Sequence, residues 1–454
     1  MRTVLRYPAV ALVAVLVMAA CTPGAPAPPT GTAPAVTPPA GTAPAGTAPA
    51  DTPTGADWQG VDDGTTLTMW TRAATEDRVT DLVNAYNESH ENQIELRVVP
   101  TDDYVAVVGA AAPNNQLPDL FSADVVFMPN WTSAGLFTDI TERIDGLPYI
   151  DNVGQAHIVA STWEGRKYGL PFIIDLSVWA YNKALFRDAG LDPESPPTNL
   201  AEFAEAARAV QALDRDGVYG TFFGGTCGGC NVFTWWPISW ADGQAVISED
   251  GTESLLTNPS MMEVYSTFNA LWEEGVIHPD SQAEAGPTWT GYFPAGGIGI
   301  MPMPASLSAM IGENLPDEDV GVTAIAGVDG GQSTFVGGDS IGISKDSQNL
   351  EQAWNFLAWM LDEEAQVEVV AQAGNVVARS DLADNQYSSA DDRLVLFNEV
   401  AGVGETPFAL HFFATYNDPL GPWIPLFRAA VFEGADEARI NELNEAINSS
   451  LRGE

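Results

Sequence analysis

The stretch LTMWTRAATEDRVTDLVNAYNESHENQIELRVV, residues 67–99, decides the fold class of this chain. It opens with Leu67–Trp70, a run that predicts a strand. Apolar residues then recur at i, i+3, i+4 and i+7 between Val79 and Tyr86, which is the spacing of one buried helix face. Ile94–Val99 predicts a second strand. A strand, a helix and a strand in this order are typical of a parallel α/β sheet.

The same alternation continues along the chain. Thr75 precedes the first helix, and Glu76 and Asp77 follow it, where acidic side chains stabilise the positive amino end of a helix. Asn349, with Gln352 three residues later, has the spacing of a capping box. The pattern predicts further strands at 117–121, 125–127, 168–172, 178–181, 298–301 and 341–344, and helices at 200–213 and 351–369.

Composition excludes several classes of protein. The 454 residues are 45% hydrophobic, which is enough apolar material for folded cores and excludes a wholly disordered chain. Lys and Arg number 18 against 61 Asp and Glu, so the formal net charge is -43. This charge repels nucleic acid and anionic lipid head groups, and we expect no nucleic-acid partner. The one long apolar run lies at the amino terminus, which excludes a polytopic membrane protein.

The amino-terminal 57 residues predict a targeting signal followed by a tether. Residues 1–20 combine basic residues, a short apolar run and small residues before Cys21, as a secretory signal peptide does. A cysteine at this place resembles a bacterial lipoprotein signal, which implies that Cys21 is lipidated and holds the protein at the outer face of the cell membrane. An ordinary signal peptide with an incidental cysteine is the alternative. Residues 21–57 are rich in Pro and Thr, which predicts an extended spacer without a core.

The other two cysteines are Cys227 and Cys230, in a Cys-Gly-Gly-Cys sequence. Outside the membrane we expect them to form a disulfide that pins a loop. A redox-active pair is the alternative, but it requires the start of a helix, whose amino end lowers the pKa of a thiol. Glycines at 224, 225, 228 and 229 indicate a loop instead.

Several blocks of sequence, taken in order, resemble the extracellular solute-binding proteins of bacterial ABC importers, family 1, which includes maltose-binding protein and other sugar-binding lipoproteins. The order and spacing of the blocks carry this resemblance, which covers nearly all of the chain after the spacer. The blocks are 67–86, 117–121 with 134–139, 168–172 with 181–186 and 188–191, 292–301, 337–344 with 351–369, and the tail 432–448.

The resemblance implies an α/β fold of the periplasmic-binding-protein type II class, with two lobes joined by crossing hinge strands. Lobe one would take residues 58–172 plus 335–376, and lobe two residues 173–334 plus 377–454. The implied function is to capture a carbohydrate, a mono- or oligosaccharide, between the lobes and deliver it to the permease subunits of the importer. A monomer that is not an enzyme and binds no cofactor is expected.

Candidate ligand residues follow from where ligands bind in α/β sheets, at the carboxyl ends of the strands. Tryptophan, with 13 copies, suits a sugar because a flat ring covers its apolar face while carboxylates and amides bind its hydroxyls. Several tryptophans are expected in or beside loops, and packing in the fold is the alternative for each. The predicted ligand-binding residues are Trp70, Arg72, Glu76, Asp124, Trp131, Asp175, Trp235, Trp236, Trp289, Tyr292, Met303, Gly338 and Asp339.

Two rival functions are weighed against sugar binding. Gly338-Asp-Ser-Ile-Gly342 matches the G-x-S-x-G nucleophile elbow, so Ser340 could serve a hydrolase. The elbow needs a helix directly after the serine, and strand-like Ile341–Ile343 follows instead. The other rival is a binding protein for a non-sugar solute such as a polyamine or a peptide, since the acidic charge favours a cation.

The sequence predicts neither a metal site nor a bound cofactor. The four histidines are scattered along the chain, with none close to another. No phosphate-binding loop and no dinucleotide fingerprint occurs. This agrees with a binding subunit whose permease and ATPase are separate chains.

Overall fold

The first strand, helix and strand form as the sequence predicts. They are β1 (Thr66–Arg72), α1 (Glu76–Ser89) and β2 (Gln93–Val99), and the two strands pair in parallel. The computed structural model describes residues 58–454. The signal peptide, Cys21 and the tether therefore lie outside the described residues.

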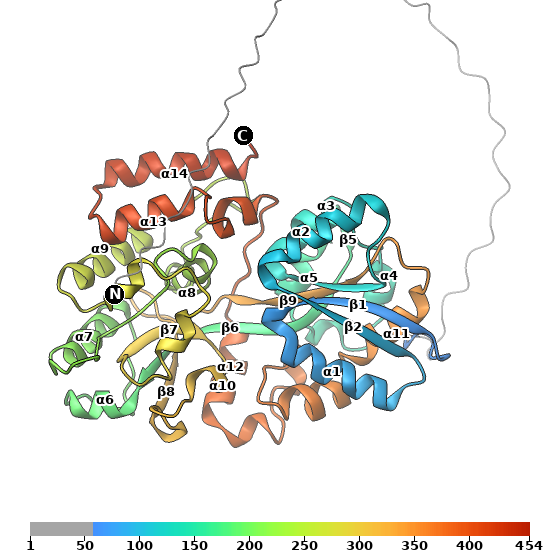
Figure 1. The fold of residues 1–454 in the computed structure, drawn as a ribbon, viewed down its shortest axis with the longest axis horizontal. Helices are drawn as coiled ribbons and strands as arrows, with labels where there is room; N and C mark the ends of the chain where they lie inside the picture. Colours follow the sequence, from blue (N-terminus) through green and yellow to red (C-terminus); the bar gives the residue numbers. More distant parts are fainter. Residues whose placement is uncertain (1–57) are drawn as a thin grey trace, which may run out of the picture. The chain divides into compact units, whose positions relative to one another are not determined.

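One seven-stranded sheet joins strands from distant parts of the chain (Figure 1). The strand order is β2-β1-β3-β9-β6-β7, with β8 also paired to β6. The β1–β2 and β1–β3 pairs are parallel and the other pairs are antiparallel. The further strands are β3 (Leu120–Asp124), β6 (Leu170–Asn182), β7 (Ile300–Pro304), β8 (Val320–Ala324) and β9 (Val336–Ile343).

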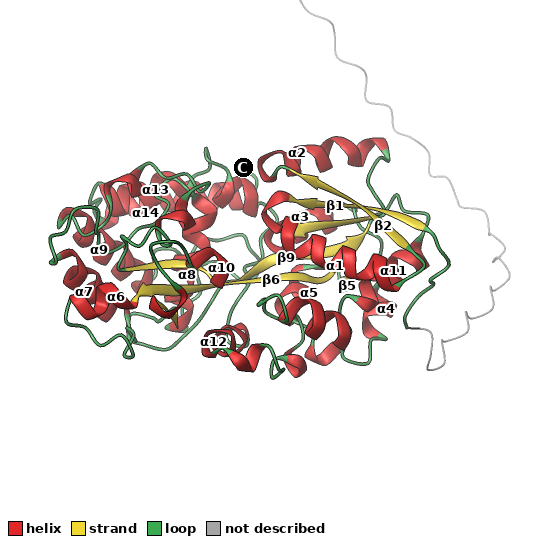
Figure 2. Cartoon of the chain, turned by 60° about the horizontal axis from the view of Figure 1, so that its bottom comes forward, coloured by secondary structure: helices red, strands yellow, loops and turns green. Residues whose placement is uncertain are grey.

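Strand β6 belongs to both halves of this sheet. Its residues 170–176 pair with β9, which in turn pairs with β3. Its residues 177–182 pair with β7 and β8. Figure 2 shows β6 and β9 as long neighbouring strands. This is the crossing strand expected of a two-lobed fold, although the sequence predicts two strands where one strand of 13 residues forms.

The remaining helices pack on the faces of this sheet and on each other. They are α2 (Thr101–Ala111), α3 (Met128–Ser133), α4 (Thr141–Asp145), α5 (Gln155–Ala160), α6 (Lys183–Asp188), α7 (Leu200–Gln211), α8 (Gly228–Ala241), α9 (Pro259–Glu273), α10 (Leu307–Met310), α11 (Leu350–Trp359), α12 (Asp392–Ala401), α13 (Trp423–Phe432) and α14 (Glu437–Leu451). A small hairpin pairs β4 (Thr162–Trp163) with β5 (Arg166–Lys167). Among residues 58–454, no helix is both long and apolar enough to cross a membrane.

Some predicted elements differ from those that the structure contains. Residues 125–127, predicted as a strand, form the 3-10 turn η3 (Val125–Phe127), because the Asp124 carboxylate accepts from the Val126 N–H. The capping box at Asn349 does not form, since the Asn349 side chain donates to Asp119 instead. The predicted helix 351–369 ends at Trp359 as α11, and the chain resumes as the π-helix η8 (Ala365–Ala371).

The Cys-Gly-Gly-Cys sequence starts a helix, so the loop predicted there is wrong. Cys227 is the N-cap of α8, and Gly228 opens the helix. The Tyr416 carbonyl explains the glycine, because a Cβ at Gly228 would lie 2.0 Å from that oxygen. The glycine therefore serves close packing at the helix start rather than loop flexibility.

Several tryptophans expected in or beside loops lie within helices. Trp131 is in α3, while Trp235, Trp236 and Trp240 are in α8. Trp423 opens α13. Helix α8 is apolar on nearly all sides and is surrounded by core, which is why its three tryptophans are buried.

Candidate functional site

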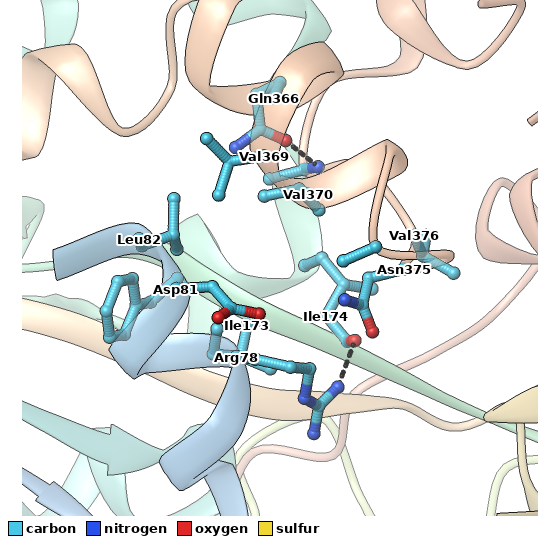
Figure 3. A pocket seen from close by; sticks show the side chains of 13 residues that line it. Arg78, Asp81, Leu82, Ile173, Ile174, Gln366, Val369, Val370, Asn375 and Val376 are labelled. Atoms are coloured by element: carbon cyan, nitrogen blue, oxygen red, sulfur yellow. Dashed lines mark hydrogen bonds between the residues drawn. The ribbon is translucent and has the colours of Figure 1, made fainter. Parts of the chain in front are cut away.

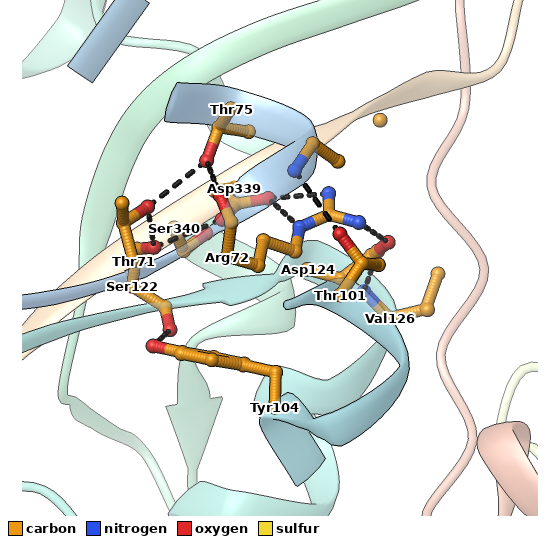
Figure 4. Close-up of polar contacts among 12 residues, drawn as sticks. Thr71, Arg72, Thr75, Thr101, Tyr104, Ser122, Asp124, Val126, Asp339 and Ser340 are labelled. Carbon is orange, nitrogen blue, oxygen red and sulfur yellow. Dashed lines mark hydrogen bonds and ion pairs between the residues drawn. The ribbon is translucent and has the colours of Figure 1, made fainter. Parts of the chain in front are cut away.

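The ends of β1 and β3 meet at a cluster of charged side chains (Figure 4). β1 ends at Arg72, and β3 ends at Asp124, which is paired in the sheet with Asp339 of β9. The Arg72 Nε and Nη2 atoms donate to Asp339 Oδ1 over 2.7 and 2.5 Å. The Arg72 Nη1 atom lies 3.1 Å from Asp124 Oδ2. One guanidinium thus bridges two carboxylates that the sheet places side by side.

The second oxygen of Asp339 is held from inside the sheet. Ser122 Oγ donates to Asp339 Oδ2 over 2.9 Å, and its oxygen also lies 3.0 Å from Thr71 Oγ1. Thr75 extends this row of hydroxyls, 2.9 Å from Thr71. Asp339 is 0% exposed, so its role in this structure is to hold Arg72 in place.

Two further charges complete the cluster. Asp175 lies on β6, and Arg78 on α1 donates to the Ile174 carbonyl over 3.2 Å. We call Arg72, Arg78, Asp124, Asp175 and Asp339 the charged cluster. It contains three carboxylates and two guanidinium groups, and its charges interact with one another across β1, β3, β6, β9 and α1.

Burial sets the electrostatics of the charged cluster. It raises the pKa of Asp124 and of Asp175, and the nearby arginines oppose this shift. Burial would lower the pKa of Arg72, but Asp339 and Asp124 outweigh it and raise that pKa above its ordinary value. The Arg72 guanidinium is therefore always charged. A group that donates a hydrogen bond to Asp124 or Asp175 would stabilise the charged form of that carboxylate.

The charged cluster has hydrogen-bonding capacity to spare. The side chains of Arg72 and Asp124 are 15% and 21% exposed. No side chain among residues 58–454 donates a hydrogen bond to the Asp175 carboxylate, which is partly exposed. Exposed carboxylate oxygens beside a guanidinium can bind the hydroxyl groups of a polar ligand.

Trp289 and Tyr292 remain partly exposed in the 3-10 turn η6 (Trp289–Tyr292). The Tyr292 ring stacks on Phe222 at 3.8 Å, and its hydroxyl donates to Asp280 over 2.8 Å. Trp70 is partly exposed as well, but the Arg97 guanidinium covers one face of its ring at 4.7 Å. Trp289 is thus the predicted tryptophan with most freedom to stack on a ligand.

Several other predicted residues are buried in the core. Trp235, Trp236 and Met303 are fully buried, and Trp131 is 7% exposed. Trp236 has Trp240, Phe412 and Tyr416 around its ring, which leaves no face for a sugar in this structure. Glu76 is exposed in the first turn of α1, apart from the hydrogen bonds of the charged cluster.

The crossing segment of β9 is shaped by close packing. Gly338 has φ +95, and a Cβ there would lie 1.9 Å from the Ile173 carbonyl oxygen. Ser340 lies inside β9 with 0% exposure, and the strand continues to Ile343. The turn into a helix that a nucleophile elbow requires is therefore not formed at Ser340. His157 faces it, with Nδ1 3.0 Å from Ser340 Oγ and Nε2 3.0 Å from the Gly337 carbonyl.

The sequence reasoning missed a contact between the segment after β3 and the carboxyl-terminal part of the chain. The rings of Phe127 and Phe413 meet edge to face at 5.4 Å, and Asn130 Nδ2 donates to the Leu410 carbonyl over 3.1 Å. Arg78 was also missed. The signal for Arg78 was its place in the first turn of α1.

The hollow in Figure 3 lies beside Arg78 of the charged cluster. It is bounded by α1, β6 and the π-helix η8, and its polar side chains are Arg78, Asp81, Gln366 and Asn375. The volume that water can enter is about 20 Å³. This is enough for about one water molecule and too little for a sugar ring.

A larger hollow, of about 500 Å³, lies between β8 and α12. Its charged walls are largely paired with each other, as in Lys183 with Glu194 and Arg393 with Asp391. Tyr181 is its aromatic residue and is buried. Among residues 58–454 no three His, Cys, Asp or Glu side chains are grouped to hold a metal ion.

Residues 72–367 match the family of bacterial extracellular solute-binding proteins. This chain belongs to that family. A binding protein of Brucella abortus is 27% identical over 252 residues, which are 55% of this solute-binding protein and 60% of that relative. The diacetylchitobiose binding protein DasA of Streptomyces coelicolor is 22% identical over 389 residues, or 83% and 87% of the two chains.

Solved structures confirm the fold of the solute-binding protein. The sugar-binding protein MalE of Xanthomonas citri superimposes with a TM-score of 0.73 at 15% sequence identity, over 86% of this chain and 98% of that one. The α/β, two-lobed periplasmic-binding-protein class expected from the sequence is therefore correct. The residue boundaries of the lobes stay a prediction.

Proposed function

We propose that this solute-binding protein captures a mono- or oligosaccharide and delivers it to the permease of an ABC importer. The observation that carries the proposal is the charged cluster, which offers carboxylate oxygens and a guanidinium at the strand ends. Sugars present many hydroxyls, and such groups bind them through hydrogen bonds while an aromatic ring covers the apolar face. The relatives named for diacetylchitobiose and for sugar support this ligand class.

Lobe movement about β6 and β9 is the proposed mechanism. Both strands run through the charged cluster, since Asp175 lies on β6 and Asp339 on β9. A ligand that touches both lobes binds the closed state more tightly than the open one and so favours closure. The closed form would then dock on the permease and release the sugar. No bond is made or broken in this scheme, and no cofactor takes part.

The amino-terminal residues complete the proposal. Cleavage after residue 20 would leave a lipidated Cys21 at the outer face of the cell membrane, in keeping with the extracellular character of the family. The spacer, at ~3.1 Å for each extended residue, would give the folded part a reach of roughly 100 Å. A monomer on such a tether can meet a permease in the same membrane.

A thermal-shift screen tests the ligand class. The panel holds mono- and oligosaccharides, polyols, amino acids, peptides and polyamines. A ligand at about 100 times its dissociation constant adds ~2.7 kcal/mol of stability, which is a shift of several degrees. Asp175→Asn should reduce the shift by a saccharide, whereas Asp216→Asn, on the exposed surface, should not. A shift by polyamines alone would overturn sugar binding and keep the fold.

The cationic alternative rests on the third carboxylate of the charged cluster. With two guanidinium groups and three carboxylates, the cluster has one negative charge in excess. Salt distinguishes the two ligand classes, because the attraction between a cation and this cluster weakens as the Debye length shortens. The dissociation constant of a neutral sugar should stay nearly constant over the same range of salt.

A further inference from the structure

The disulfide between Cys227 and Cys230 has no part in sugar binding as proposed. The structure joins the two sulfurs, and both residues are partly exposed. Cys227 is the N-cap of α8, a helix of 14 residues, and Cys230 lies in its first turn. The start of a helix is the setting in which a Cys-x-x-Cys pair becomes redox-active.

A role as a structural staple explains this bond poorly. The disulfide closes a loop of sequence separation 3, and the loss of chain entropy that stabilises a cross-linked protein grows with loop length. The helical turn already brings the two Cα atoms to 5.3 Å. Backbone hydrogen bonds hold the neighbouring segment instead, from Gly225 to Ser281 and from Thr226 to Glu284. The bond therefore joins no distant parts of the chain.

The helix start favours a negative charge on Cys227. The Cys230 N–H donates to Cys227 Sγ over 3.2 Å. This contact and the positive amino end of α8 would stabilise a thiolate at Cys227 once the disulfide opens. The segments packed nearby, 281–291 and 413–422, carry the carboxylates of Glu284 and Asp418 and no lysine, and Arg428 of α13 donates to the Gln282 carbonyl.

The backbone at Gly286 lies close to both sulfurs. Gly286 has φ +119, and a Cβ there would lie 3.0 Å from Cys227 Sγ and 3.6 Å from Cys230 Sγ. The first turn also contains a buried acceptor without a donor, since Asn231 Oδ1 has no hydrogen-bond partner among the described residues. The reduced Cys230 would carry an S–H donor next to it in sequence.

We propose that Cys227 and Cys230 form a redox-active pair that exchanges with dithiols outside the cell membrane. A thiolate of the dithiol attacks Cys230 Sγ, and the S–S bond breaks with its electron pair leaving on Cys227 Sγ. The second thiolate of the dithiol then attacks the sulfur bonded to Cys230, which closes the oxidised dithiol as a cyclic disulfide. Cys230 leaves as a thiolate and takes up a proton, so the pair gains two electrons and the dithiol loses two.

Native-state reduction is the first test, on the whole chain carrying Cys21→Ser so that only this pair can react. Folded protein is treated with dithiothreitol at neutral pH, quenched and labelled with a maleimide-polyethylene glycol. Two labels within minutes are the expected result, and none when the reduced protein is first reoxidised with oxidised glutathione and then labelled. A pair that resists dithiothreitol until the protein is unfolded overturns the proposal.

Single variants test which sulfur becomes the stabilised thiolate. Cys230→Ser leaves the Cys227 thiol alone, and Cys227→Ser is its matched control. Alkylation by iodoacetamide at pH 6.5 should be at least ~10-fold faster for Cys227, because its pKa would lie below the ~8.5 of a free thiol. Equal rates overturn the proposal. Because a variant could fold poorly, the thermal midpoint of each is measured beside the wild type, and the reduction test needs neither variant.

Discussion

Arg72 shows how one side chain organises the candidate site. Its guanidinium holds Asp339, which is fully buried, and reaches Asp124 at the exposed side. The sequence predicts Arg72 and Asp124 from their places at strand ends and Asp339 from its place at the second crossing between the lobes. It could not show that they bind one another, since the pairing of β3 with β9 brings together residues more than 200 positions apart.

Removing Arg72 should destabilise the protein strongly. Arg72→Ala leaves the Asp339 carboxylate buried without its partner, and such a loss costs ~3–5 kcal/mol of unfolding free energy. Urea denaturation measures it. The double variant Arg72→Ala/Asp339→Asn should recover much of the loss, because the fully buried charge is removed and Asp124, which also loses its arginine, is 21% exposed. A cost under ~1 kcal/mol for the single variant would show that water replaces the arginine.

Trp236 distinguishes a core residue from a ligand residue. It is 0% exposed, so Trp236→Ala should lower the unfolding free energy by about 3–5 kcal/mol through the cavity it leaves. Trp289→Ala, at a partly exposed ring, should leave the thermal midpoint nearly unchanged and weaken saccharide binding by ~1–3 kcal/mol. Calorimetry of unfolding and of binding on both variants checks this. The reverse pattern would return Trp236 to the ligand site.

At the scale of the elements, β6 and β9 decide how the two halves of the molecule connect. Gly338 lets the two strands approach, and His157 on α5 holds β9 through Ser340 and the Gly337 carbonyl. The G-x-S-x-G pattern has its explanation here, as close strand packing rather than a nucleophile turn.

Gly338→Ala should disrupt the pairing of β6 with β9. The added Cβ would meet the Ile173 carbonyl, and crowding of this kind adds at least ~1–3 kcal/mol to the ordinary cost of a positive φ. Gly135→Ala is the matched control, since Gly135 has φ +71 and nothing within 4 Å of the added Cβ. The difference in thermal midpoint between the two variants measures the crowding. Equal midpoints would mean that the strands separate without cost.

His157 should make the stability of this element depend on pH. Burial lowers its pKa to about 4 from 6.5, so the unfolded chain binds the extra proton first. Its contribution is complete above pH 6.5 and is lost as the pH falls towards 4, by about 3 kcal/mol in all. His157→Gln should remove this part of the pH dependence. Denaturation of both proteins from pH 7 to pH 4 checks it, and parallel curves would contradict it.

Net charge is a property of the whole molecule. At -43 the chain repels itself, and salt screens this repulsion. The thermal midpoint should therefore rise between 10 and 300 mM salt, an interval over which the Debye length falls from ~30 Å to under 10 Å. Scanning calorimetry measures the thermal midpoint over this range of salt, both for the protein alone and with a saccharide that binds it. A midpoint that falls with salt would show that attractive pairs such as Arg72–Asp339 dominate instead.

Sequence by itself determined the alternation of strands and helices, the solute-binding resemblance and the candidate residues Arg72 and Asp124 at strand ends and Asp175 and Asp339 at the crossings. Those depend on local periodicity and on order along the chain, which a sequence contains in full. Tertiary structure alone decided that Trp236 is core, that Cys227 starts a helix and that Gly338 serves strand packing. Each depends on a neighbour far away in sequence, such as Tyr416 or Ile173, and burial by a distant segment outweighs local preference.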